Sequence, residues 1–115
     1  MANDFKNAIA QNVSNAAGGT TIYTTPATKT SIMLELDIAN TTQSVVEASV
    51  EILDSSVSAS AWRYLVKNAP VPSGGSLMVI AGQKIVLEAG DKVRVTSSAA
   101  SVMDAVAAIL EDVNS

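Results

Sequence analysis

Two neighbouring segments alternate apolar and polar residues with a period of two, and this pattern restricts the chain to few folds. In residues 31–40, SIMLELDIAN, the apolar set is Ile32, Leu34, Leu36 and Ile38. In residues 45–53, VVEASVEIL, it is Val46, Ala48, Val50 and Ile52. Because successive side chains of a strand point to opposite faces, each segment predicts a strand with one buried and one solvated face.

Other short β-prone runs follow at roughly ten-residue spacing, with Gly, Pro, Asn, Asp or Ser between them. They are residues 20–25, 61–67, 76–81, 84–87 and 92–98. Regularly spaced short strands are typical of sandwiches and related architectures. The sequence therefore predicts an all-β fold, a single antiparallel β-sandwich of the jelly-roll or Ig-like type with about eight strands.

The stretch VLEAGDKVRV, residues 86–95, predicts a hairpin around the turn Glu-Ala-Gly-Asp. Gly90 is expected to have a positive φ, because only glycine adopts it without a Cβ clash. Asp91 can accept hydrogen bonds from the local backbone and close the turn. Val93 and Val95 would then point inward, so these residues have a structural role.

Two segments are ambiguous. Residues 101–113, SVMDAVAAILEDV, fit a helix or a strand that is apolar on both faces, and the all-β surroundings favour the strand. Residues 5–13, FKNAIAQNV, place Phe5, Ile9 and Val13 four apart, which is helical spacing. The same residues fit a first strand or an extended N-terminal arm spanning residues 1–13.

Length and composition exclude several classes of protein. The 115 residues suit one domain, residues 1–115. No Cys and no His are present, and seven basic against eleven acidic residues give a net charge of −4. The charge argues against nucleic acid as a partner. The N-terminal residues do not have the pattern of a signal peptide, and no run is long and apolar enough to span a membrane, so we expect synthesis in the cytoplasm of the producing cell and no contact with a membrane.

The residues with catalytic potential are few. Without His and Cys, the usual activated nucleophiles cannot be built, so we expect no enzyme, no catalytic residues, no cofactor and no metal. The carboxylates Glu35 and Asp37 share one strand face, as do Glu47 and Glu51, and we interpret both pairs as solvated. Oxygen ligands for calcium occur near Asp54, Ser55 and Ser56, but their spacing is not that of an EF-hand.

Two aromatic residues, Trp62 and Tyr64, lie two apart on one predicted strand. They would project from the same face and could form a platform on which a sugar stacks. Packing in the core or in an interface is the alternative. The chain has only four aromatic residues in all, fewer than carbohydrate-binding modules usually show.

The run from Leu65 to Val113 resembles the C-terminal half of small virion proteins of tailed bacteriophages. The shared pattern comprises the turn VPSGGSL, the unit KIVLEAGD, the strand VRVTSSA and a closing apolar strand. FKNAIAQNV and TTIYTTP extend the resemblance over nearly the whole chain. It implies a β-sandwich or jelly-roll fold, a non-enzymatic role in the virion, and no catalytic residues. It also implies location on the head, neck or tail without deciding between them.

The hydrophobic content, 48%, exceeds what one small sandwich must bury. The segment 105–110, apolar on both faces, and the N-terminal arm would be hard to cover in a monomer. We therefore expect a homo-oligomer, with a trimer favoured, that docks on the major capsid protein as a capsid decoration or cement protein. The alternatives are a neck or tail accessory protein and a carbohydrate-binding adhesion module. The predicted interface residues are Phe5, Ile9, Val13, Trp62 and Tyr64.

Overall fold

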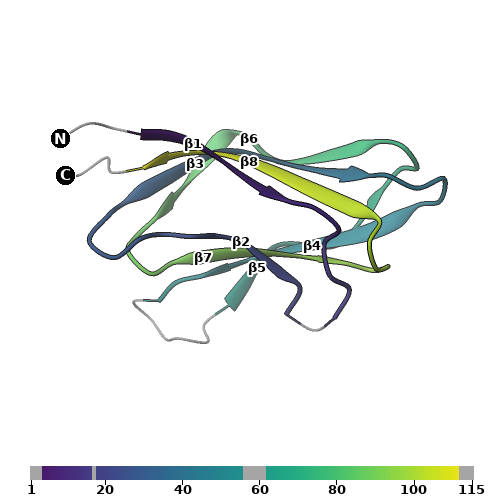
Figure 1. The fold of residues 1–115 in the computed structure, drawn as a ribbon, viewed down its shortest axis with the longest axis horizontal. Helices are drawn as coiled ribbons and strands as arrows, with labels where there is room; N and C mark the ends of the chain where they lie inside the picture. The colour runs from purple at the N-terminus through teal and green to yellow at the C-terminus, as the bar shows by residue number, and fades with distance from the viewer. Residues whose placement is uncertain (1–3, 17, 56–61, 112–115) are drawn as a thin grey trace.

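The computed structural model of the protein describes residues 4–16, 18–55 and 62–111 (Figure 1). Within these ranges the chain forms eight strands and no helix. The strands are β1 (Asp4–Ala10), β2 (Thr20–Thr24), β3 (Ser31–Asn40), β4 (Val46–Leu53), β5 (Trp62–Val71), β6 (Ser76–Leu87), β7 (Lys92–Ser97) and β8 (Met103–Glu111). The described part therefore contains no helix long and apolar enough to cross a membrane.

The strands form two four-stranded antiparallel sheets that pack face to face (Figure 1). Sheet A has the order β1-β8-β3-β6, and sheet B has the order β2-β7-β4-β5. Strand β1 pairs with β8, β2 with β7, β3 with β6, and β4 with β5. The first four strands thus pair with the last four in reverse order, as in one long hairpin rolled into a double sheet. This is the topology of a jelly roll, and it decides between the two sandwich types that the sequence left open.

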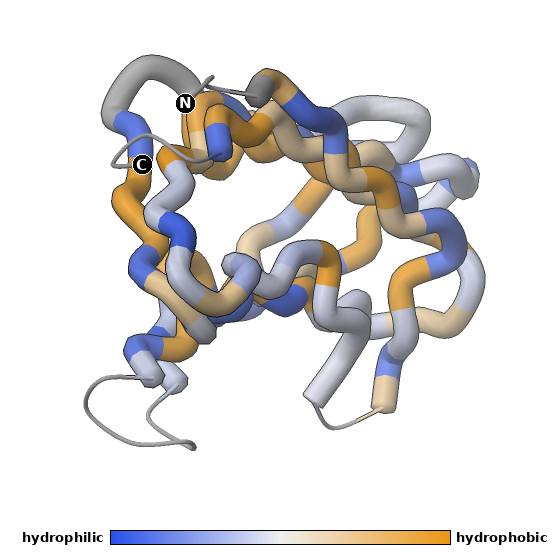
Figure 2. Tube along the Cα trace, turned by 60° about the vertical axis from the view of Figure 1, so that its left-hand side comes forward, coloured by the Kyte–Doolittle hydropathy of each residue, from blue (hydrophilic) through white to orange (hydrophobic). Residues whose placement is uncertain are grey.

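The core lies between the sheets and is built from the inward side chains of both. Leu36, Ile38, Val50, Val93 and Val95 are fully buried, as their alternation predicts. Figure 2 shows the result along the chain, with apolar segments in orange interleaved with polar segments. The all-β sandwich predicted from the sequence is confirmed.

A β-bulge in β3 corrects the prediction for the first half of that strand. Its register with both neighbours shifts between Met33 and Glu35. An extra residue at this point reverses which side chains point inward before it. Met33 is fully buried, whereas Ile32 and Leu34, which strict alternation places inward, are only half-buried.

The N-terminal segment is a strand of the sandwich, so its interpretation as a free arm or a helix is wrong for the described residues. Strand β1 pairs with β8 along its whole length, from Asp4 with Glu111 to Ala10 with Ala105. Beyond the strand, Val13 is fully buried and its N–H donates to the Met103 carbonyl at 2.8 Å. Residues 1–3 of the proposed arm lie outside the described ranges.

The second ambiguous segment is also a strand. Strand β8 runs through the centre of sheet A between β1 and β3. Its inward side chains include Met103, Ala105, Ala107 and Ile109, all fully buried. Residues 112 and 113 of the predicted strand lie outside the described ranges.

Candidate interaction surface

The outward face of sheet A carries most of the exposed apolar side chains among the described residues. Five large apolar residues lie there with exposed fractions between 45% and 77%: Phe5, Ile9, Met78, Val86 and Val106. We call these five the outer apolar face. A sandwich strand normally presents polar residues outward, so this face is the candidate surface for contact with another protein.

The strand registers arrange this face in cross-strand rows. Phe5 lies opposite Leu110, which lies opposite Ile32, which in turn lies opposite Val86. This first row is apolar on all four strands. In the second row Ile9 lies opposite Val106, followed by Asp37 and then Met78. Cross-strand neighbours on one face are about 4.5–5.5 Å apart at Cβ, so each row is continuous.

The structure divides the residues predicted for an interface. Phe5 and Ile9 belong to the outer apolar face, with exposed fractions of 77% and 68%. Val13 does not, because it is part of the core, so its assignment to an interface is wrong for this fold. Sequence reasoning did not single out Met78, Val86 or Val106. The signal for Val106 was the segment 105–110, whose two apolar faces cannot both point into one core.

Trp62 and Tyr64 lie on the other sheet, at the edge strand β5. The Arg94 guanidinium stacks on the Trp62 ring at 3.8 Å from its centroid, and it pairs with Glu51 through hydrogen bonds of 3.0 and 3.2 Å. One face of the indole is therefore occupied within the protein. Tyr64 is half exposed, with the Lys67 ammonium 5.2 Å from its ring centroid. This leaves a smaller stacking platform than two free aromatic rings would offer.

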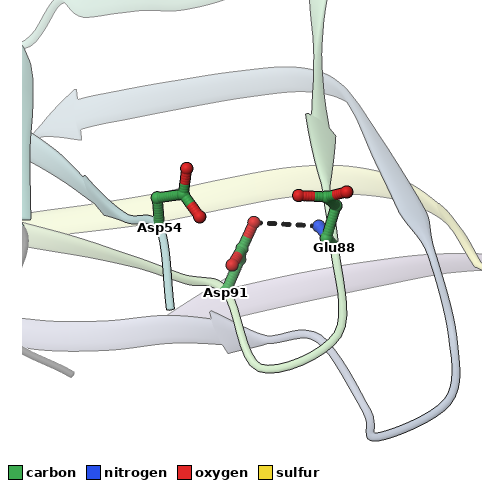
Figure 3. Close-up of side chains that lie close together, drawn as sticks. All are labelled: Asp54, Glu88 and Asp91. Atoms are coloured by element: carbon green, nitrogen blue, oxygen red, sulfur yellow. Dashed lines mark hydrogen bonds between the residues drawn. The ribbon is translucent and has the colours of Figure 1, made fainter. Parts of the chain in front are cut away.

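The turn between β6 and β7 has the geometry that its sequence predicts. Gly90 has a φ of 86°, and the Asp91 N–H donates to the Glu88 carbonyl at 2.9 Å. The buried Asp91 carboxylate accepts the Glu88 N–H at 2.9 Å and the Ser55 N–H at 3.0 Å (Figure 3). Asp91 therefore closes its own turn and joins it to the end of β4.

The same turn brings three carboxylates together. Asp54, Glu88 and Asp91 have oxygens within 4.8 Å of one another (Figure 3). Carboxylate oxygens in such a group could hold a hard cation such as calcium. However, the hydrogen bonds to Ser55 and to the Glu88 backbone already account for the position of Asp91. The Ser55 hydroxyl also donates, to Asp91 and to the Ala89 carbonyl, and Ser56 lies outside the described residues.

A buried polar cluster links the two sheets at one end of the sandwich. The Tyr23 hydroxyl of sheet B donates to Glu111 at 2.5 Å and contacts the Ser31 hydroxyl at 2.8 Å. Lys6 forms an ion pair with Glu111 at 3.1 Å. The Tyr23 hydrogen bond, together with Lys6 and Lys29, lowers the pKa of Glu111 below its ordinary value against the opposing effect of burial. Burial and the bond to Glu111 raise the pKa of Tyr23 to about 12. Tyr23 therefore stays protonated and donates the hydrogen bond, while Glu111 stays ionised and accepts it. We interpret the cluster as structural.

No pocket is found among the described residues. Comparison with known proteins adds no identification. No protein-family model matches the chain, and no curated protein or solved structure matches it either. The resemblance to phage virion proteins therefore stays a prediction.

Proposed function

We propose that this protein is a non-enzymatic structural protein of a tailed-phage virion, acting as an oligomeric decoration or cement protein on the capsid. The observation that carries the proposal is the outer apolar face, which offers a second protein a broad surface where an isolated sandwich would be polar. The resemblance of the sequence to phage virion proteins indicates a tailed-phage virion as the particle. Jelly rolls occur in viral capsid proteins but also in lectins and cupins, so the fold alone does not decide the function.

The two sheets support this reading by their asymmetry. The outward side of sheet B carries the Glu51–Arg94 ion pair and the exposed Glu47. Five of the seven large exposed apolar residues among the described residues lie instead on sheet A. One side suits solvent and the other suits a partner, as a protein docked on a larger surface requires. The major capsid protein is the proposed partner, and a trimer is the favoured oligomer.

Two other functions remain as alternatives. A neck or tail accessory protein would use the same face on a different part of the particle. A carbohydrate-binding module would use Trp62 and Tyr64, and the Arg94 side chain on the Trp62 ring makes this the less favoured function.

Quantitative mass spectrometry of purified virions tests the proposal, with the major capsid protein as internal standard. Hundreds of copies per particle are expected for a decoration protein, whereas about a dozen or fewer, as in a ring, would indicate the neck or tail. Absence from the particle would contradict the proposal. A monomer that ignores particles and binds a glycan array through Trp62 would establish the adhesion module instead.

A further inference from the structure

Two carboxylates lie within the outward face of sheet A. Glu35 and Asp37 are two residues apart on β3, on either side of the buried Leu36. Asp37 lies opposite Val106 on one side and Met78 on the other, and Glu35 lies opposite Ala108. The acid pair is therefore surrounded by apolar side chains, in the middle strands of the face.

The negative charge of this pair is not balanced within the described part of the chain. One Asp37 carboxylate oxygen, Oδ1, is buried and has no hydrogen-bond partner there. The hydrogen bond and the charge that Glu35 shares with Asp37 raise the pKa of Glu35. The two carboxyl groups therefore lie close enough to interact, and one buried oxygen of the pair has no hydrogen-bond partner among the described residues.

The other charged groups of sheet A do not supply that cation. Lys6 of β1 is engaged with Glu111 of β8. Asp104 of β8 is another acid, and its carboxylate accepts the Asn12 N–H at 3.0 Å. Lys84 of β6 is exposed and forms no ion pair among those found in the described residues, which join Lys6 to Glu111 and Arg94 to Glu51.

We propose that the partner covering the outer apolar face is a protein surface with a lysine or arginine amid apolar side chains, and that this cation binds between Glu35 and Asp37. An apolar partner without a cation would bury two like charges unpaired, which is strongly unfavourable. A second copy of this chain would bring a second acid pair to the same face. Charge complementarity therefore selects a basic partner over self-association through sheet A. The inference rests on the proposed function for the source of the partner, a capsid protein.

The test is binding of purified protein to phage particles that lack it, measured by co-sedimentation over a series of protein and salt concentrations. Glu35→Gln combined with Asp37→Asn removes the charge with little change of shape, and Val106→Ser removes apolar contact. Glu47→Gln, on sheet B, is the matched control for loss of a carboxylate. Thermal unfolding shows that each variant is folded, and sedimentation velocity gives its oligomeric state.

We expect the Glu35→Gln/Asp37→Asn variant to bind about tenfold more weakly or worse, because a partner cation loses its buried counter-charges. Val106→Ser should also bind more weakly, and Glu47→Gln should bind like the parent. Binding of the parent should weaken with salt more steeply than binding of the charge-neutral variant, since salt screens only the ionic part.

The other outcomes separate the two proposals. Equal or tighter binding by the charge-neutral variant overturns the basic partner while the virion role stands. If the parent does not bind particles at all, the proposed function fails and this inference fails with it. If Val106→Ser dissociates an oligomer of the free protein, the face is occupied by a second copy and the basic partner is again overturned.

Discussion

Replacing Met33 with alanine tests the bulge that reverses the inward and outward side chains at the start of β3. Met33 is fully buried, opposite Ile109, which is also fully buried. Truncation removes the buried side chain and leaves a cavity, at a cost of about 2–5 kcal/mol. At about 2.1 cal/mol/K per residue, the 115 residues unfold with an entropy of about 0.24 kcal/mol/K. The melting temperature should therefore fall by about 8–20 °C.

Leu34→Ala is the matched control, because leucine is also a large apolar residue and lies next in the chain. Leu34 is only half-buried, so its loss should cost about 1 kcal/mol, or about 4 °C. The assay is thermal unfolding followed by circular dichroism, repeated with urea to obtain the free energy of unfolding. A larger loss at Leu34 than at Met33 would refute the bulge and restore strict alternation.

Three further changes have expected outcomes. Gly90→Val should lower the free energy of unfolding by about 1–3 kcal/mol, because φ is 86° and a Cβ would lie 2.9 Å from the Ser55 hydroxyl; coincident urea curves would disprove this. Because the pKa of Glu111 is lowered in the folded protein, its ionised carboxylate contributes to the stability of the fold. This contribution is complete above the ordinary pKa of 4.5 and is lost as pH falls through the folded pKa. Glu111→Gln should therefore lose less stability on acidification than the parent, as melts across pH would show. The pKa of Glu35 is raised in the folded protein, so ionisation of this carboxyl opposes folding. The melting temperature of Glu35→Gln should therefore be no lower than that of the parent at neutral pH, and any increase should disappear in acid.

Much of the fold was predictable because its signals are local. Alternation in β4 and β7 identifies buried positions such as Val50 and Val95, and both are fully buried. Gly90 could be placed because a turn with positive φ has a strong preference for glycine. The reversal in β3 was not predictable, since Met33 and Leu34 are both apolar and the pattern fits either register. Only pairing with β6 and β8, distant in sequence, selects one of them.

The interaction surface was less predictable, because it depends on which strands are neighbours. The spacing of Phe5, Ile9 and Val13 by four residues suggested one apolar stripe. However, β1 is a strand that presents Phe5 and Ile9 outward, whereas Val13 lies after the end of the strand and is buried in the core. Lys6 lies between Phe5 and Asn7 in the sequence, and neither neighbour indicates its ion pair with Glu111, 105 positions away. The sequence predicts that Glu35 and Asp37 are solvated, and Glu35 is indeed exposed. It does not show that sheet A places Val106 and Met78 on either side of Asp37.

Methionine oxidation in the free protein and on assembled particles tests the central claim most directly, because the chain carries its own probes. Met78 belongs to the outer apolar face and is 65% exposed, whereas Met33 and Met103 are fully buried. Exposed methionines are oxidised to the sulfoxide far faster than buried ones. Limited peroxide treatment followed by peptide mass spectrometry should oxidise Met78 rapidly in the free protein and slowly on particles, with Met33 and Met103 protected in both. Equal rates for Met78 in the two states would show that the outward face of sheet A is not the docking surface.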